Sequence, residues 1–420
     1  MTTLRDIKCV SCGATYPVGK FVYKCPQCNG ILEIRYDYEA IKKTDFLERM
    51  QDYGTIRNIW DFQELLPVDH ARNIVSLEEG NTPILEYADF VQDDSKPSLF
   101  IKDESRNPTG SFKDRPLSVA ISKVKEDGSQ AIITSTHGNA GVAMAAYAAK
   151  ARLDSYIIVP DDTEVDKVVM MQAFGSKVFQ IEGDISDAYN FSLLISDELG
   201  LVNLATTFLS PYTTEGDKTI AFEVYKQFQG NPPEWMVFPI GAGPLLVGCY
   251  KGFKELMDLG LLNRMPKLVA VQSEKCAPIA KAYEQGLDEV AEWREEGETI
   301  AVGIHEPLRG YPEDGTITLQ RIKESGGIAL TVSDNEIVQA MFDLARKEAI
   351  FPEPTGAVGF AGAMKLYRQN QFKAEDRVLV LISGSGYKES GGYKKYLKDP
   401  VKIERSLAAF KTHFGGESDE

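Results

Sequence analysis

The chain has 420 residues, of which 43% are hydrophobic and 26% charged, a composition typical of globular proteins with packed cores. Its 62 acidic residues outnumber 46 basic ones, giving a net charge of −16. This charge argues against nucleic-acid or anionic membrane partners, and no apolar stretch is long enough to span a bilayer. The first residues lack the pattern of a signal peptide, so we expect a cytoplasmic protein.

Four of the six cysteines lie in the first 28 residues, as two Cys-x-x-Cys pairs. The pairs are Cys9 with Cys12 and Cys25 with Cys28. Because four thiolates at this spacing suit a tetrahedral ion, we predict a Cys₄ zinc ribbon over residues 1–36. Cysteine fills every coordination position and basic residues are few, which favours structural zinc over catalysis or nucleic-acid binding. The segment YPVGKFVYK between the pairs predicts a short hairpin that turns near Gly19.

The remaining residues, 37–420, predict one catalytic domain. Its first part is irregular, and LEEGNTPI (77–84) is expected to form a loop. From Leu99 onward, apolar strand-like segments alternate with helical periods, which predicts an α/β fold with two open, twisted, mostly parallel sheets. We expect a smaller lobe at about 120–215 inserted in a larger one, and a frayed C-terminal HFGGESDE. The predicted strands are LFIK, AIITST, SYIIVP, KVFQIE, WMVFPI, KLVAVQ and RVLVLIS.

Four of these strands end in segments that carry chemistry, and ligands of open α/β sheets bind beyond such strand ends. The segments are NPTGSFKDRP (107–116), HGNAG (137–141), GAGPLLVG (241–248) and GSGYK (384–388). GAGPLLVG predicts a phosphate cradle, because glycines let backbone amides approach an anion at a helix N-terminus. It matches neither the dinucleotide nor the P-loop pattern, which indicates a small phosphorylated cofactor.

Lys113 lies at the predicted start of a helix that is capped by Ser111 and ends at Gly128. Surface helices usually carry lysine near their C-terminal end, where the helix dipole favours a cation. We expect the helix amides and Arg115 to ease loss of the Lys113 proton. A lysine that forms a Schiff base needs such a lowered pKa.

The order of these motifs resembles the fold type II, or tryptophan-synthase-β type, family of pyridoxal 5′-phosphate enzymes. Within it, KDESRNPTGSFKDR is most similar to threonine synthases, as are the ribbon-like extension and the EGNTP loop. The resemblance covers roughly residues 76–390. It implies a cofactor bound in the cleft between two lobes, an amino-acid substrate and a homodimer.

The resemblance also implies roles for the residues at the strand ends. Lys113 would bind the cofactor covalently and then move protons between substrate carbons. Phe112 would lie beside the ring, Asn139 would donate to the ring 3-oxygen, and Ser383 would face the pyridine nitrogen. A hydroxyl at that nitrogen favours elimination and replacement over transamination. The amides expected to bind the cofactor phosphate are those of Gly241, Ala242, Gly243, Leu245 and Leu246.

The residues expected to bind substrate are Ser135, Thr136, His137, Gly138 and Arg115. His137 could contact a substrate phosphate or carry protons, and Arg115 and Lys388 are candidates either for a second anion pocket or for solvated positions.

The implied activity is that of a carbon–oxygen lyase, threonine synthase, which converts O-phosphohomoserine and water into threonine and phosphate. His137 before Gly138 and Ala140 after Asn139 depart from the usual pattern. A related ammonia-lyase, dehydratase or β-replacement enzyme therefore stays open, as does a zinc-ribbon interaction protein with a degenerate α/β body.

Overall fold

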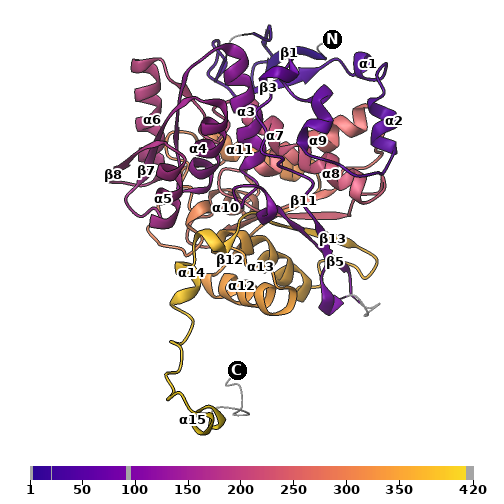
Figure 1. The fold of residues 1–420 in the computed structure, drawn as a ribbon. Coiled ribbons are helices and arrows are strands. Elements are labelled where there is room, and N and C mark those ends of the chain that lie inside the picture. Colours follow the sequence, from indigo (N-terminus) through magenta and orange to yellow (C-terminus); the bar gives the residue numbers. More distant parts are fainter. Residues whose placement is uncertain (1–2, 20, 91–95, 413–420) are drawn as a thin grey trace.

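The fold is that of a computed structural model, which describes residues 3–19, 21–90 and 96–412 (Figure 1). The HFGGESDE tail, expected to be frayed, lies outside the described residues. Within the described ranges, no helix combines the length and the apolar character needed to cross a membrane.

The N-terminal unit is a three-stranded antiparallel sheet in the order β2-β1-β3. Its strands are β1 (Leu4–Cys9), β2 (Thr15–Tyr16) and β3 (Leu32–Tyr36). The hairpin predicted within YPVGKFVYK is wrong, because the turn that contains the first cysteine pair reverses the chain and sets β2 beside β1. The amide of Cys9 donates to the carbonyl of Ala14 across this turn. Lys24, at the end of the predicted hairpin, forms a β-bridge to Ile31 and does not pair within YPVGKFVYK.

Short elements connect this unit to the sheets, as the irregular sequence predicts. Residues 77–83 form a loop that ends where β4 (Ile84–Glu86) begins. The other elements are α1 (Tyr38–Ile41), α2 (Phe46–Gln51) and the 3-10 helices η1 (Ile59–Leu65), η2 (Ala71–Asn73) and η3 (Ala88–Phe90).

The larger lobe is built on a six-stranded sheet in the order β12-β11-β10-β13-β5-β4, which is parallel except for β4. The parallel strands are β5 (Ser98–Asp103), β10 (Trp235–Pro239), β11 (Lys267–Ser273), β12 (Ile328–Val332) and β13 (Arg377–Ile382). In β13, Val378, Val380 and Ile382 enter one core and Leu379 and Leu381 the other. Both faces are therefore covered, as apolar runs in parallel strands predict.

The smaller lobe carries a four-stranded parallel sheet in the order β8-β7-β6-β9. The strands are β6 (Ala131–Ser135), β7 (Asp154–Pro160), β8 (Lys177–Ile181) and β9 (Val202–Asn203). They are joined by α4 (Asn139–Ala151), α5 (Val165–Ala173) and α6 (Ile185–Leu199). All seven predicted strands are confirmed, whereas β4, β9 and β12 were not predicted.

Helices cover both faces of the larger sheet, and α12 and α13 lie together on one of them (Figure 1). The α-helices are α3 (Asp114–Asp127), α7 (Pro211–Asp217), α8 (Thr219–Gln227), α9 (Pro244–Asp258), α10 (Pro278–Glu284), α11 (Pro312–Glu324), α12 (Asp334–Glu348), α13 (Pro354–Arg368), α14 (Gly391–Lys394) and α15 (Leu407–Lys411). Three 3-10 helices complete the chain: η4 (Glu104–Arg106), η5 (Val302–Ile304) and η6 (Gly386–Lys388).

The N-terminal unit shares its core with the larger lobe. Ile34 and Tyr36 of β3 belong to the same hydrophobic cluster as Leu246 and Phe253 of α9. Tyr36 also donates its hydroxyl to the buried Glu215 of α7 at 2.6 Å. The N-terminal unit therefore packs against α9, the helix that begins directly after Gly243 of the glycine-rich turn.

Candidate active site

One cavity of about 960 Å³, counting the solvent at its mouth, is lined by parts of the segments that follow β5, β6, β10 and β13 in the sequence. These are the four strand ends that the sequence indicated. Most predicted site residues line this cavity: Phe112, Lys113, Ser135, Thr136, His137, Gly138, Asn139, Gly241, Ala242, Gly243, Leu245 and Ser383. The side chain of Leu246 is fully buried beside it, while Arg115 and Lys388 lie outside the lining.

Lys113 is the residue immediately before α3, not a residue within it. The turn that leads to it is closed by Asp114, which accepts hydrogen bonds from the amide and the hydroxyl of Thr109. The predicted Ser111 cap is wrong, since within the described chain its buried hydroxyl has no hydrogen-bond partner. The predicted helix end is confirmed, because Gly128 ends α3 with a φ of 84°.

The Lys113 ammonium group donates to the Thr206 hydroxyl at 2.6 Å and lies 4.7 Å from the centre of the Phe112 ring. Burial lowers the pKa of Lys113, and the nearby carboxyls of Asp217 and Glu306 oppose that shift. The direction predicted for this pKa is confirmed. Its cause is removal from water and not the arginine two residues later.

The prediction that Arg115 binds substrate is wrong. It is fully buried beneath the cavity, where its guanidinium contacts Glu104 at 2.7 Å and Glu223 at 2.6 Å. Its remaining N–H groups reach Thr82 and Thr219, so none is left for a substrate. Lys388 is also buried rather than solvated, and burial lowers its pKa to about 8.

The glycine-rich turn after β10 fits a bound phosphate. Gly243 has a φ of 109°, and a Cβ there would lie 2.2 Å from the Thr318 hydroxyl oxygen, so this position requires glycine. The first backbone bond of α9 runs from Val247 to Gly243. The amides of Leu245 and Leu246 precede it and are free of the helix ladder, at its positive end.

The turn after β6 offers a second set of amides. The first backbone bond of α4 runs from Val142 to Gly138, so the amides of Asn139, Ala140 and Gly141 precede it. A Cβ on Gly138 would lie 2.2 Å from Cδ of Lys167, which packs over this turn and lines the cavity. The buried ammonium group of Lys167 contacts Glu353 at 3.1 Å and Glu389 at 2.5 Å.

Asn139 is held by Glu353, to which its side-chain N–H₂ donates. Its Oδ1 atom is buried and has no hydrogen-bond partner within the part of the chain that the structure describes. To donate into the cavity, the amide would have to turn away from Glu353. An orphaned polar atom in the wall indicates a polar ligand.

His137 is uncharged at neutral pH. Burial, with the nearby His305 and Lys167, lowers its pKa to about 3. It can therefore make a neutral hydrogen bond in the cavity, but it supplies no positive charge to a phosphate.

Sequence reasoning missed several lining residues. Glu306 faces Lys113 across the cavity and accepts a hydrogen bond from Tyr311, and burial raises its pKa to about 7. Thr206 follows β9, a strand of two residues, and Glu306 follows a 3-10 turn. The elements before them are too short for periodicity to reveal in the sequence.

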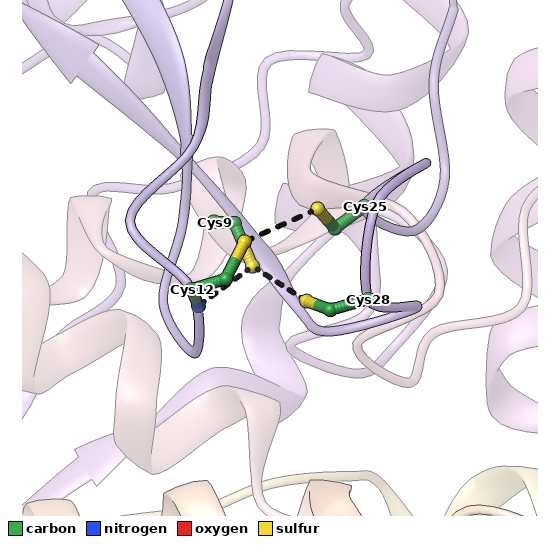
Figure 2. Close-up of side chains that lie close together, drawn as sticks. All are labelled: Cys9, Cys12, Cys25 and Cys28. Atoms are coloured by element: carbon green, nitrogen blue, oxygen red, sulfur yellow. Dashed lines mark hydrogen bonds between the residues drawn. The ribbon is translucent and has the colours of Figure 1, made fainter.

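The four N-terminal cysteines converge in space (Figure 2). Their sulfurs all lie within 4.8 Å of one another, with Cys9 and Cys28 3.5 Å apart and Cys12 and Cys25 3.6 Å apart. A tetrahedral zinc ion with Zn–S bonds of about 2.3 Å holds its sulfurs about 3.8 Å apart. A Cβ on Gly30 would lie 3.1 Å from the Cys9 sulfur, so glycine keeps the backbone close to the thiols. The donor set fits such an ion.

Comparisons with known proteins agree with this geometry. Residues 75–384 match the family model described as pyridoxal-phosphate dependent enzyme. The threonine synthase of Methanocaldococcus jannaschii is 33% identical over 96% of this chain and 98% of its own length, and that of Methanosarcina acetivorans is 32% identical over 99% and 100%.

Among solved structures, a processed threonine deaminase from Solanum lycopersicum aligns with a TM-score of 0.65 at 19% identity, covering 91% of this chain and 97% of that one. This likeness shows the fold alone. Pyridoxal phosphate fits the cavity, which offers a lysine of lowered pKa and the free amides at the start of α9. The chain belongs to the pyridoxal-phosphate dependent enzymes of fold type II.

Proposed function

We propose that the chain is a threonine synthase, which converts O-phosphohomoserine and water into threonine and phosphate. The observation that carries this proposal is the 33% identity with a threonine synthase over 96% of the chain. The match with the second threonine synthase extends over 99% of this chain and 100% of that relative, so it includes the ribbon as well as both lobes.

Pyridoxal phosphate, when bound, supplies an electron sink for charge that develops next to the amino carbon of a substrate. In this proposal Lys113 anchors it, and the amides of Leu245 and Leu246 bind its phosphate group. Ser383, at the end of β13, contributes a neutral hydroxyl to the same cavity. Phe112 supplies an apolar wall beside Lys113.

The reaction breaks the bond between Cγ and the phosphate oxygen, delivers a proton to Cγ and adds the hydroxyl of water to Cβ. Protons leave Cα and Cβ on the way, and Cα recovers one. Lys113 is the proposed base, because its lowered pKa makes the neutral amine accessible. Glu306 has a pKa of about 7 and is the second group in the cavity able to hold or release a proton near neutral pH.

Two anionic groups of the substrate need partners. We assign the carboxylate to the first amides of α4 with the hydroxyls of Ser135 and Thr136, which line the same wall. Among the described lining residues, Lys113 and Lys167 are the cationic side chains. Glu353 and Glu389 already contact the Lys167 ammonium group, and its third N–H is our candidate contact for the γ-phosphate.

The substrate is tested by offering O-phosphohomoserine, threonine, serine and 2,3-diaminopropionate side by side. We expect threonine and phosphate in equal amounts from O-phosphohomoserine, and little oxo-acid from the other three. Oxo-acid from the unphosphorylated amino acids, with O-phosphohomoserine inert, would make the chain an ammonia-lyase instead. Borohydride treatment of the purified yellow protein should fix the cofactor to the peptide that contains Lys113.

The phosphate contact is tested by Lys167→Gln. Loss of one charge-assisted phosphate contact costs about 1.5–3 kcal/mol, so kcat/KM should fall by roughly one to two decades. Lys177→Gln, which removes a charge from the exposed strand β8 of the same lobe, is the matched control and should leave kcat/KM unchanged. Equal effects of both changes would contradict the assignment.

We also propose that Cys9, Cys12, Cys25 and Cys28 bind one structural zinc ion, in a cytoplasmic enzyme whose thiols stay reduced. Purified protein should contain about one zinc per chain. Cys25→Ser should lose the metal, whereas Cys249→Ser, which changes a buried cysteine outside the four of the ribbon, should retain it. Zinc-free protein from a preparation without chelator would count against the site.

A further inference from the structure

One short part of the cavity wall is held from behind by the N-terminal unit. Segment 203–208, which leads from β9 toward α7, contributes Ala205, Thr206 and Thr207 to the cavity lining. Thr206 accepts the hydrogen bond of the Lys113 ammonium group at 2.6 Å. Because β9 has only two residues and lies at the edge of the smaller sheet, strand pairing holds little of this segment.

Tyr23 of the N-terminal unit holds the first end of the segment. It lies two positions before Cys25, and its hydroxyl accepts a hydrogen bond from the backbone amide of Asn203 at 2.7 Å. Asn203 is fully buried, and its side-chain oxygen accepts in turn from the amide of Ala205 at 3.0 Å. One hydroxyl of the N-terminal unit therefore completes the backbone hydrogen bonding where the segment begins.

Lys24, the next residue, holds the other end through a carboxylate. The amide of Phe208 donates to one oxygen of Asp314 at 3.0 Å. Asp314 is fully buried in the first turn of α11, and its other oxygen lies 3.6 Å from the Lys24 ammonium group. Lys24 also contacts Glu313 at 3.1 Å, and its side chain is only 13% exposed. Because a buried carboxylate needs a partner, Lys24 stabilises the group that binds the amide of Phe208.

Packing fixes these two residues in place. The centre of the Phe21 ring lies 5.4 Å from that of Tyr23 and 4.7 Å from that of Tyr212. Tyr212 is in the first turn of α7, the helix that follows the segment. On the other side, Cys25 comes directly after Lys24 and belongs to the four converging cysteines. Aromatic contacts and the cysteine cluster therefore anchor Tyr23 and Lys24 from both sides.

We propose that Tyr23 and Lys24 are positioning residues for the active site, which hold segment 203–208 so that the Thr206 hydroxyl meets the Lys113 ammonium group. The inference rests on the proposed role of Lys113 as the cofactor anchor. Neither of the two residues lines the cavity, so both act on Lys113 through the segment. The N-terminal unit thus supports the active site, in addition to the metal site proposed for it.

The first test measures the pH at which the cofactor-free chain binds pyridoxal phosphate half-maximally, followed by absorbance. Only the neutral amine reacts with an aldehyde, so this midpoint follows the pKa of Lys113. In Tyr23→Phe and in Lys24→Met, Thr206 should move and the ammonium group should lose its acceptor, which lowers the midpoint by up to about one unit. Removal of the Lys24 charge alone would raise it, because a nearby cation disfavours the ammonium form. A midpoint that stays in place or rises in both variants would overturn the proposal.

The second test combines each change with Thr206→Val. In a chain that already lacks the acceptor, Tyr23→Phe and Lys24→Met should shift the midpoint no further, because they act through the same hydroxyl. A general loosening of the fold would add its effect in both backgrounds, so additive shifts would overturn the proposal. Lys24→Arg, which keeps the charge beside Asp314, should restore the midpoint of the unchanged chain.

Lys8→Met is the matched control. Lys8 is an exposed lysine directly before Cys9, as Lys24 directly precedes Cys25. This control should leave the midpoint in place, and every variant should keep the zinc content of the unchanged chain. An equal shift in Lys8→Met would show a general effect of charge and would overturn the proposal. A shift that occurs only together with loss of zinc would also overturn it, because the metal and not these contacts would then hold the segment.

Borohydride labelling separates failure of this inference from failure of the proposed function. The charged groups that face Lys113, the carboxyls of Asp217 and Glu306, are present in every variant. A label on Lys113 with an unmoved midpoint would overturn this inference alone, whereas a label on another lysine would overturn the proposed anchor as well. No substrate is used, so the result does not depend on whether the enzyme forms threonine.

Discussion

Two clusters of buried charge flank the start of α3 and differ in how they are paired. Below the cavity, Arg115 and Lys102 meet Glu104 and Glu223, and every donor of the two cations has an acceptor. Within the cavity, Lys113 donates to a neutral hydroxyl. Of its two neighbouring carboxyls, Glu306 is bonded to Tyr311, while Asp217 Oδ1 has no partner among the described residues.

The difference separates structural charge from reactive charge. Arg115 holds the pKa of Glu223 down at about 2, because the attraction between the two outweighs the effect of burial. Burial outweighs the attraction of nearby Lys113 and raises the pKa of Asp217, like that of Glu306, to about 7. The carboxyls of Asp217 and Glu306 can therefore exchange protons near neutral pH, and both lie near Lys113.

The largest effect is expected from Lys113→Ala. Turnover should fall by about 10³-fold or more, because one group serves as both anchor and base. The free energy of unfolding should change by less than about 1 kcal/mol, since Lys113 has no buried ion pair to lose. Single-turnover kinetics and urea unfolding measure the two quantities. Near-normal activity would contradict the whole assignment.

Arg115→Ala should have the opposite profile. It leaves Glu104 and Glu223 buried without their main partner, which should cost about 3–5 kcal/mol of stability. Urea unfolding measures this loss, with Arg368→Ala on the surface of α13 as the control. A change below 1 kcal/mol would show that the paired cluster does not hold the fold.

Glu306→Gln tests the carboxyl of raised pKa through the pH dependence of stability. The pKa of Glu306 is about 7 in the folded chain and about 4.5 in its ordinary state, so between these values the folded chain binds more protons than the unfolded one. Stability should therefore fall as pH rises from 5 to 7, by at most about 1.4 kcal/mol per pH unit from this group. The variant, which cannot titrate there, should lose less. Identical pH slopes in urea unfolding would remove Glu306 from the set of titrating groups.

The sequence predicted those parts of the site that follow regular elements. Lys113, Asn139, Gly243 and Ser383 each follow a strand of five or more residues, whose apolar run is visible without a structure. The parallel sheets bring these strand ends together, so the cavity could be predicted from chain order.

Contacts made across the fold could not be predicted in this way. Arg115 resembles a free cation in the sequence, because its partner Glu223 is 108 positions away. The hairpin was wrong for a similar reason, since the turn beside the cysteines sets β2 against β1. Thr206 was missed because β9 has only two residues and shows no periodicity.

Thr206→Val tests that missed contact and should have the smallest effect. Valine keeps the shape but removes the acceptor of the Lys113 hydrogen bond, which favours the charged amine. The pKa of Lys113 should fall further, by about one unit or less. Since only the neutral amine reacts with an aldehyde, the pH at which cofactor-free chain binds pyridoxal phosphate half-maximally should shift downward, as followed by absorbance. Thr207→Val, which alters the same wall without touching Lys113, should leave that midpoint in place, and an upward shift in Thr206→Val would mean that the hydroxyl stabilises the neutral amine.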